Sequence, residues 1–442
     1  MYKFLLALAF YLPFQIALNP TKGVDLASIR VLILIIFLFW LAQGLKNKKL
    51  NIKNTLQTWL LVAFMVLNLL SVFVAKNTDW SWRKLLFLFS ITPLYFVVAD
   101  VVNSREKISK LAKAFVLGGA VVSIIGIVQF LAQFAIGLEK TYKFWADYVI
   151  VPFLGKSFSE AVLLNPSWLV NVAGETYLRA TATFPDPHML SFYLGLLIPM
   201  ALGILIYEKK RKFLWIFCLI ILLLADLLTF SRGGYLGLFG GAIFIIILFF
   251  SKLGFKEETA AGDGEKPSFK KKISNKYKTG ALALISLMVV SLLFSNPVSQ
   301  RFYSSFNLKE GSNAGRIETW KKAIEVVADN PLVGVGIGNY ALAIKADASY
   351  REPIYAHNTY LDIAAETGIL NALIWFSLLG TTAFALYIKG KKDGLLLMLA
   401  VSIVIFSIHS LAETAIYSPV VLTLLVSIIG ISNIDLKNEK VS

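Results

Sequence analysis

Charged and thiol-bearing residues are scarce in this chain. Of its 442 residues, 16% are charged and 57% are hydrophobic, and the mean hydropathy is +0.70. Soluble domains carry about a quarter charged residues, so this balance excludes a water-soluble protein. Cys218 is the only cysteine, which excludes an intrachain disulfide. It lies within an apolar run, and we interpret it as a packing residue.

The chain instead contains many long apolar runs. A helix needs roughly 20 apolar residues to cross about 30 Å of hydrocarbon. The sequence therefore predicts an all-α polytopic membrane protein of about twelve transmembrane helices. The first run follows Lys3 and resembles a signal peptide, but residues 16–20 offer no cleavage site, so we interpret it as a retained helix. The predicted spans are 3–18, 26–45, 56–75, 85–102, 112–138, 188–207, 213–228, 234–250, 280–295, 369–388, 394–410 and 418–432.

Lysine and arginine gather in alternate connections between these runs. Short loops rich in these residues stay in the cytoplasm, which predicts that both chain ends are cytoplasmic. The net charge of +16 then follows from topology and needs no nucleic-acid partner. The basic connections contain Lys46, Lys48, Lys49 and Lys53; Arg105, Lys107, Lys110 and Lys113; residues 209–212; Lys389, Lys391 and Lys392; and Lys270, Lys271 and Lys272 of a Gly-, Glu- and Lys-rich linker.

This topology leaves two long segments on the outer side, both rich in aromatic residues. Loops of this length are functional or disordered, and their Trp and Tyr residues favour packing at the membrane interface. The predicted organisation is 1–138, helices 1–5; 139–187, first outer loop; 188–250, helices 6–8; 251–279, cytoplasmic basic linker; 280–295, helix 9; 296–368, large outer loop, expected to be catalytic; and 369–442, helices 10–12 with a cytoplasmic tail.

The second outer loop contains recognisable helix signals. Ser312 or Asn313 can cap a helix that ends at Asp329-Asn330-Pro331, and Gly368 ends a short helix that begins near His357. The run from Gly334 to Gly338 resembles a nucleotide-binding loop, but no strand precedes it, so we interpret it as structural.

Arginines recur on the outer side, where topology does not require them. The side chain of any single arginine can extend to the lipid headgroups. Several together suit a pyrophosphate, because the planar guanidinium makes paired, charge-assisted hydrogen bonds to phosphate. The outer arginines are Arg30, Arg83, Arg179, Arg232 and Arg316.

The chain has three histidines, His188, His357 and His409, all expected near the outer ends of helices. For a single histidine, the favoured interpretation is a structural hydrogen-bonding role. Beside arginines, however, a histidine is held neutral because the positive charges lower its pKa, and it can then act as a general base. A base with a phosphate clamp indicates glycosyl transfer from a diphosphate-linked sugar.

The pattern of these residues resembles the O-antigen ligase and polymerase superfamily. The resemblance spans roughly residues 170–375 and rests on Arg179 to Ser191, Ser231 to Gly234, Gly315-Arg316 with Trp320, Pro331, Gly334 to Gly338, His357-Asn358, Glu366 and Gly368. It implies a C-type glycosyltransferase architecture in the bacterial inner membrane, an undecaprenyl pyrophosphate-linked donor, and inverting, metal-independent transfer to an acceptor hydroxyl without a cofactor. It also implies a part in the biosynthesis of lipopolysaccharide or another polysaccharide of the cell envelope.

The resemblance also suggests roles for single residues. His357 matches the family's proposed base, and Arg179, Arg232 and Arg316 match its donor-phosphate arginines, with Arg30 as a secondary candidate. His188 departs from the family pattern, which has an asparagine-like residue there.

Further residues are candidates for acceptor binding or support. His409 and Glu413 lie four residues apart, so on a continuous helix they share a face, either for acceptor or proton-relay function or as a structural pair. Asp186 either orients an arginine or forms a turn. Asn358 and His188 complete this group. A metal site needs more ligands than His409 and Glu413 provide.

Several interpretations remain open from the sequence. The acceptor is a glycolipid for a ligase, another repeat chain for a polymerase, or a protein for an O-oligosaccharyltransferase. A flippase or transporter for the same lipid-linked glycans is the alternative class, although such proteins place polar residues near the midplane and these charges gather at the outer rim. The sequence does not determine the sugar, the linkage or the oligomeric state.

Overall fold

The computed structural model describes residues 1–21, 23–164, 167–172, 174–208, 210–250, 296–307, 309–350, 352–391 and 393–435. The predicted linker 251–279 and the predicted ninth span 280–295 lie outside the described residues, as does the end of the predicted cytoplasmic tail.

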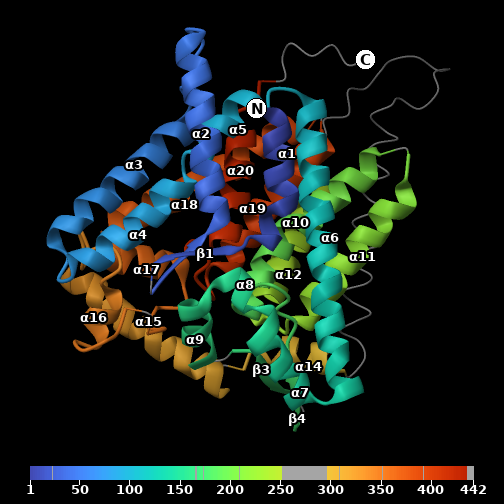
Figure 1. Cartoon of the computed structure of the whole chain (residues 1–442), viewed down its shortest axis with the longest axis vertical. Helices are drawn as coiled ribbons and strands as arrows, with labels where there is room; N and C mark the ends of the chain where they lie inside the picture. The colour runs from blue at the N-terminus through green and yellow to red at the C-terminus, as the bar shows by residue number, and fades with distance from the viewer. Residues whose placement is uncertain are drawn as a thin grey trace.

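Helices account for the other eleven predicted spans within the described part of the chain (Figure 1). Among the described residues, six regions are long and apolar enough to cross a membrane, namely α2, α3 with η2, α4 with α5, α6, α10 and α18. The protein is therefore an all-α membrane protein, and the count of twelve crossings stays a prediction. The helices are α1 (Tyr2–Tyr11) with η1 (Leu12–Phe14), α2 (Ser28–Lys46), α3 (Leu56–Ser71) with η2 (Val72–Val74), α4 (Thr78–Ile91), α5 (Leu94–Val101), α6 (Arg105–Ile136), α10 (Pro187–Tyr207), α11 (Lys212–Leu228), α12 (Arg232–Phe250), α18 (Ile369–Gly390), α19 (Gly394–His409) and α20 (Pro419–Ile431).

Both predicted outer loops contain short helices. The first also contains an antiparallel hairpin, and a second hairpin joins α1 to α2. These hairpins were not expected from the apolar pattern. The hairpin that joins α1 to α2 explains why the predicted span 3–18 is too long, since the chain leaves the helix at Phe14. The elements are β1 (Ala17–Thr21), β2 (Val24–Ala27), α7 (Leu138–Phe144), the π-helix η3 (Trp145–Val149), α8 (Val151–Leu154), α9 (Lys156–Leu164), β3 (Leu169–Val172), β4 (Glu175–Leu178), α14 (Pro297–Ser304), α15 (Gly311–Asp329), α16 (Tyr340–Ile344) and α17 (Thr359–Thr367).

Helix α10 lies at the centre of the bundle, where it packs against α6, α11, α12 and α19. In its most apolar stretch 89% of the residues are buried, whereas only 22% are buried in the corresponding stretch of α2. Apolar side chains that remain exposed on peripheral helices suit contact with lipid. The close packing of α10 depends on small residues, because a Cβ on Gly203 would lie 3.1 Å from the backbone of Leu395 in α19.

One end of the bundle collects the basic connections (Figure 1, top). Arg105 at the start of α6 donates a hydrogen bond of 2.5 Å to Asp393, which precedes α19. Lys389 donates to the Ser432 carbonyl oxygen at 2.5 Å, and Lys113 pairs with Glu208. The loop elements α7, α14 and α15 lie at the opposite end. The predicted inner and outer connections are therefore separated along the bundle.

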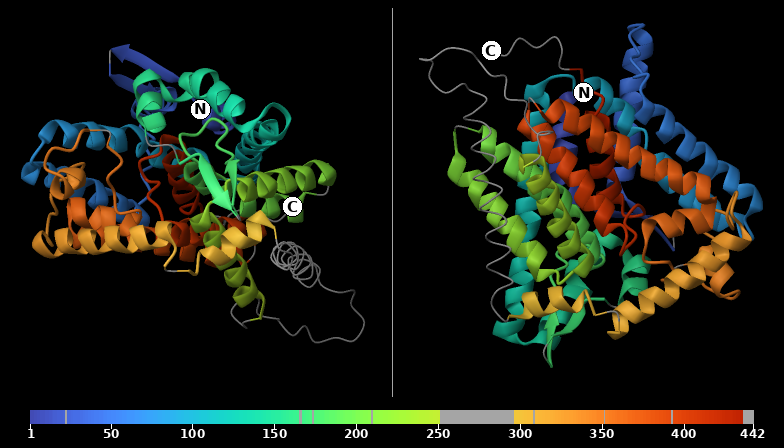
Figure 2. Two further views of the ribbon diagram at one scale, coloured as in Figure 1. Left: turned by 90° about the horizontal axis from the view of Figure 1, so that it is seen from below. Right: turned by 180° about the vertical axis from the view of Figure 1, so that it is seen from behind.

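Helix α15 lies across the end of the bundle that carries the loops (Figure 2). It ends at Asp329, as the sequence predicts, but it begins at Gly311 with Glu310 as its N-cap. The expected caps Ser312 and Asn313 are wrong because both lie inside the first turn. Asn313 instead accepts a hydrogen bond from Arg232 and donates to carbonyl oxygens of the preceding segment.

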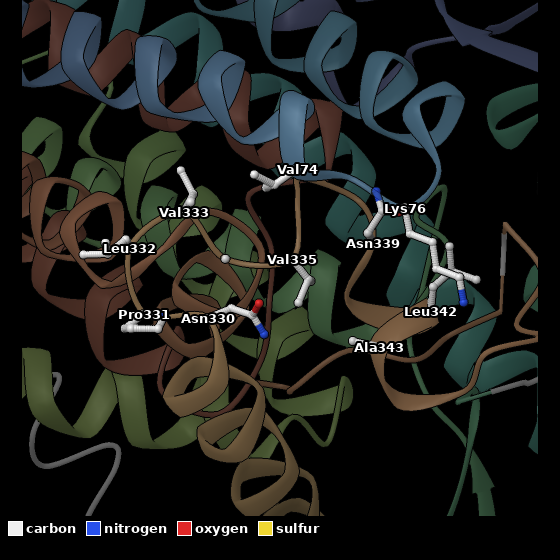
Figure 3. A pocket seen from close by; sticks show the side chains of 11 residues that line it. Val74, Lys76, Asn330, Pro331, Leu332, Val333, Val335, Asn339, Leu342 and Ala343 are labelled. Carbon is white, nitrogen blue, oxygen red and sulfur yellow. The ribbon is translucent and has the colours of Figure 1, made fainter.

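The glycine run in the second loop has a structural role. Gly334, Gly336 and Gly338 all adopt positive φ, and a Cβ on Gly336 would lie 2.5 Å from the Cβ of Ala75. Asn339 fastens the run to the α3–α4 junction, since its amide donates to Ser81 and accepts from the Asn77 N–H. A pocket of about 470 Å³ adjoins the run (Figure 3). Its lining is mainly apolar, and no carboxylate or histidine is among the lining residues.

Candidate active site

A second cavity, of about 940 Å³, lies among the loops and the adjoining ends of the helices. It brings together residues that are far apart in the sequence. Its lining includes the predicted base His357, the supporting residues His188, Asp186 and Glu413, and all five predicted outer arginines, Arg30, Arg83, Arg179, Arg232 and Arg316. His409 and Asn358 do not line it.

Glu413 is the centre of the polar contacts in this cavity. Its carboxylate lies 2.9 Å from His357 Nδ1 through one oxygen, and its other oxygen pairs with Arg316 of α15. His188 Nε2 lies 3.7 Å from that second oxygen. The Glu413 side chain is only 5% exposed, so one buried carboxylate restrains two imidazoles and a guanidinium.

The backbone around His357 is held firmly. His357 adopts a φ of +51°, a conformation uncommon for a residue other than glycine. Asn358 caps α17 by accepting hydrogen bonds from the N–H groups of Tyr360 and Leu361. Thr359 Oγ1 donates to the Glu413 carbonyl oxygen at 3.0 Å. The cap and this contact fix His357 beside Glu413, which gives Asn358 a supporting role outside the cavity.

Asp362 links the segment that carries His357 to the segment that carries Glu413. One of its oxygens accepts from the Ala356 N–H at 2.7 Å, next to His357, and the other accepts from Thr414, next to Glu413. Burial raises the pKa of Asp362 to about 6. No role for this residue was predictable from the sequence pattern.

The charges at the site make His357 a stronger base than a free histidine. Burial alone lowers the pKa of a histidine, but the hydrogen bond and the negative charge of Glu413 outweigh burial, so the pKa of His357 is raised. The expectation that arginines hold this pKa down is wrong, because Arg316 acts in that direction but is outweighed. Burial raises the pKa of Glu413, yet His188, His357 and Arg316 together lower it below its ordinary value.

The predicted helical pairing of His409 with Glu413 is wrong, because α19 ends at His409 and Glu413 lies in the following turn. His409 is fully packed instead, with its ring stacked on Phe192 at 3.5 Å between centroids. Its Nε2 is 3.4 Å from Ser231 Oγ, which in turn lies 3.0 Å from His188 Nδ1. His409 is therefore linked to the cavity through Ser231 and His188.

Two glycines allow the close packing of the Ser231 turn against His409 and Ser191. A Cβ on Gly233 would lie 2.5 Å from His409 Cδ2, and one on Gly234 would lie 2.0 Å from Ser191 Oγ. The Ser231-Arg232-Gly233-Gly234 turn thus brings the start of α12 against α10 and α19. This close approach places Arg232 at the cavity.

Arg232 is buried and held by the second loop. Its guanidinium pairs with Glu310 and donates to Ser304 and Asn313, each at 3.0 Å. Arg301 Nη1 lies 3.6 Å from the same Glu310 carboxylate and also lines the cavity. Burial and the charge of Arg232 lower the pKa of Arg301 to about 10. Glu310 therefore fixes two cations at one side of the cavity.

Arg179 is buried without a carboxylate partner among the described residues. Its Nε donates to the Thr229 carbonyl oxygen at 2.7 Å and its Nη1 to that of Ser167 at 2.9 Å, while Nη2 has no hydrogen-bond partner. Burial lowers its pKa to about 9, and the charge of Arg301 acts in the same direction. A buried, partly unsatisfied guanidinium at a cavity wall suits an anionic ligand.

The remaining candidates lie at the same cavity. Asp186 caps α10 by accepting from the N–H groups of His188 and Met189, which agrees with the turn-forming alternative, and burial raises its pKa to about 6. Arg30 donates to Ser90 Oγ at 2.7 Å and lies over the Phe87 ring. Arg83 lies over the ring of Tyr350.

Comparison with known protein families gives a match to part of this chain. Residues 217–376 match the family model described as O-antigen ligase. This segment belongs to the O-antigen ligase superfamily. No curated protein matches the chain. With its apolar helices, the match supports an O-antigen ligase-like membrane glycosyltransferase that works on glycan and lipid substrates at the bilayer.

The O-antigen ligase segment supplies part of the cavity, including Arg232, Arg316 and His357. Arg179 and Glu413 come from the chain on either side of the match. The arrangement thus depends on helices beyond the matched residues. Their individual roles stay predictions.

Three residues in or beside the cavity of the O-antigen ligase-like protein were not predicted from its sequence. Arg301 lies in the same outer loop as Arg316, so counting every outer arginine identifies it. Glu310 and Asp362 carry no such signal, because an acidic residue in a polar loop is expected on solubility grounds alone. Within the described residues, no group of three His, Cys, Asp or Glu side chains is arranged to hold a metal ion; metal independence stays a prediction.

Proposed function

We propose that the protein transfers a glycan from an undecaprenyl pyrophosphate-linked donor to a hydroxyl group of a glycan or glycolipid acceptor. The observation that supports this best is the His357–Glu413 pair in a cavity lined by six arginines, the five predicted ones and Arg301. Transfer from a diphosphate needs a base for the acceptor and cations for the leaving group. Both kinds of group line this cavity.

The pair suits general-base catalysis. Glu413 accepts a hydrogen bond from His357 Nδ1–H, which fixes the tautomer and leaves the Nε2 lone pair for the acceptor. As the acceptor oxygen attacks the anomeric carbon, Nε2 takes its proton. The bond between that carbon and the pyrophosphate oxygen breaks, and the pyrophosphate leaves with the electron pair. Attack opposite the leaving group inverts the configuration.

Arginines that line the same cavity as His357 suit the pyrophosphate. In our proposal Arg179, Arg232, Arg301 and Arg316 stabilise the charge that develops on the leaving group. Phe153, Leu154, Phe158 and Val162 also line the cavity and suit the isoprenoid part of the donor. No protein-bound cofactor is required.

We infer the orientation from charge. The end that carries the basic connections faces the cytoplasm, together with both chain termini, and the cavity opens at the outer leaflet of the bacterial inner membrane. The predicted division into transmembrane segments and two outer loops, 139–187 and 296–368, follows from the same assignment.

Replacement of His357 tests the proposal. The His357→Ala variant, purified and supplied with lipid-linked donor and acceptor, is expected to transfer glycan about 10²- to 10⁴-fold more slowly, since it lacks the base. Lys322→Ala, which changes a half-exposed residue of α15, is the control and keeps the wild-type rate. Transfer by His357→Ala at the control rate would show that the base is wrongly assigned.

The acceptor class is tested in cells from which the gene has been deleted. A ligase predicts that full-length glycan chains accumulate on the lipid carrier. A polymerase predicts short, capped chains with a single repeat. Loss of glycan from proteins alone would contradict the proposed glycan or glycolipid acceptor and indicate a protein O-oligosaccharyltransferase, and donor movement across vesicles without transfer would indicate a flippase.

A further inference from the structure

A part of the cavity between α2 and α4 differs from the part that holds the proposed pyrophosphate. We name it the α2–α4 subsite and define it by Arg30, Trp80, Arg83, Phe87 and Tyr350, all of which line the cavity. Three of these residues are aromatic, and two are arginines.

The two arginines are held by rings and a hydroxyl group instead of carboxylates. Arg30 lies 5.1 Å from the Phe87 ring centroid and donates from Nε to Ser90 Oγ. Arg83 lies 5.0 Å from the centroid of Tyr350. In both cases the guanidinium is positioned while it keeps donors for a ligand.

Charge pairing separates these arginines from the other cations of the cavity except Arg179, which donates to carbonyl oxygens at the proposed pyrophosphate site. Arg232 pairs with Glu310, Arg316 with Glu413 and Lys84 with Glu366. Among the described residues, no carboxylate forms an ion pair with Arg30 or Arg83. Their positive charge is thus uncompensated within the described part of the protein.

The rings form a rigid aromatic surface beside this charge. Trp80 and Tyr350 contact edge to face, with 5.5 Å between centroids. The outer end of α4 is fixed by Asn339, which bonds to Asn77 and Ser81. The C–H faces of a sugar ring pack well on aromatic rings, whose faces are electron-rich. A planar guanidinium beside them suits a carboxylate.

We propose that the α2–α4 subsite binds an acidic sugar of the glycan substrate, with Arg83 and Arg30 on its carboxylate and Trp80 and Tyr350 against its ring. This rests on the proposed function, because the subsite shares its cavity with His357. It assigns Arg30 to the glycan and no longer to the donor pyrophosphate.

The test compares two oligosaccharides that differ only in charge. Binding of galacturonate hexamer and of its fully methyl-esterified, neutral form is measured with the full chain in phosphatidylcholine nanodiscs. The wild-type protein is expected to bind the acid at least about tenfold more tightly than the ester. Arg83→Gln and Arg30→Gln remove this preference, and Lys322→Gln keeps it. Equal binding of the two forms by the wild-type protein would refute the proposal.

A second ligand distinguishes this subsite from the pyrophosphate site. Farnesyl diphosphate is expected to bind Arg83→Gln as it binds the wild type, and Arg179→Gln about tenfold more weakly. An equal loss in both variants would assign Arg83 to the diphosphate and overturn the inference. Loss of the acid preference when phosphatidylglycerol is added to the nanodiscs would indicate a lipid headgroup instead. Unchanged diphosphate binding by Arg179→Gln would count against the proposed function alone.

Discussion

The Glu413 carboxylate contacts His357, Arg316 and, at a longer distance, His188. A buried acid with these neighbours does more than orient one imidazole. It also compensates the positive charge of Arg316, so its removal leaves a poorly exposed guanidinium without its partner, which is costly. Base and cation are thus coupled through one residue.

Replacing Glu413 is predicted to change the pH dependence of transfer. General-base catalysis needs neutral His357, so the rate rises with pH through the pKa of His357. Glu413 raises that pKa against the effect of burial. The Glu413→Gln variant lacks the negative charge, so its acidic limb is expected to move to lower pH while the maximal rate falls by roughly 10²-fold.

The measurement is kcat as a function of pH for the wild type, Glu413→Gln and the exposed control Glu318→Gln. The control should reproduce the wild-type profile. An acidic limb that stays in place in Glu413→Gln would mean that Glu413 does not set the pKa of the base.

Single residues were predictable from the sequence where location alone identifies them. His357 and the arginines stand out because topology does not require them on the outer side. Their partners were not predictable, since Glu413 lies 56 positions from His357 and Glu310 lies in an ordinary polar loop. The direction of the His357 pKa depends on those partners, so the sequence predicted it wrongly.

At the level of elements, Gly368 connects α17 directly to α18. It adopts a φ of +91°, and a Cβ at this position would lie 2.0 Å from the Leu332 carbonyl oxygen. The Ile369 N–H also donates to the Pro331 carbonyl oxygen at 2.9 Å. This junction fixes the C-terminal end of α17, the helix that begins just after His357.

Alanine at Gly368 is predicted to destabilise this junction. Strain at positive φ and the clash with Leu332 are expected to cost about 2–4 kcal/mol, which lowers the midpoint of thermal unfolding in detergent. Gly315→Ala is the matched control, because the added Cβ of this helical glycine meets nothing within 4 Å. It should leave the midpoint unchanged or raise it. Equal midpoints for the two variants would argue against a strained junction.

Apolar runs predicted the long helices well because burial or lipid contact along a whole span leaves a strong pattern. The hairpins β1–β2 and β3–β4 were missed, since each strand has only four or five residues and mixes polar with apolar positions. Helix caps were harder to predict than the helices themselves. The side chain of Asn313, for example, can cap a helix, but in the structure it accepts a hydrogen bond from Arg232 instead.

Across the whole molecule, charge is divided between two ends. Lysine-rich connections and their carboxylate partners lie at one end, and the arginine-lined cavity lies toward the other. The sequence predicted this division from loop composition alone. The shape of the cavity was not predictable from the sequence, because residues from eight or more separate segments form its wall.

Labelling of single cysteines is predicted to report this orientation. Cys218 is the only cysteine of the chain, so replacing it with alanine gives a background without thiols. In that background Glu175→Cys, in the first outer loop, should react with a membrane-impermeant maleimide in intact cells. Lys48→Cys, in a basic connection, should react only after lysis. The opposite pattern would place the cavity in the cytoplasm and contradict transfer at the outer leaflet.

The size of the cavity limits what the enzyme can sense of its substrates. About 940 Å³ is near the upper end of the range for small-molecule sites. In the proposed function it encloses the diphosphate linkage and the first sugars on either side of it, whereas the remainder of a polysaccharide extends into the surrounding water. Recognition within this cavity is then confined to the junction being made, so the cavity itself does not count the repeats of a finished polymer.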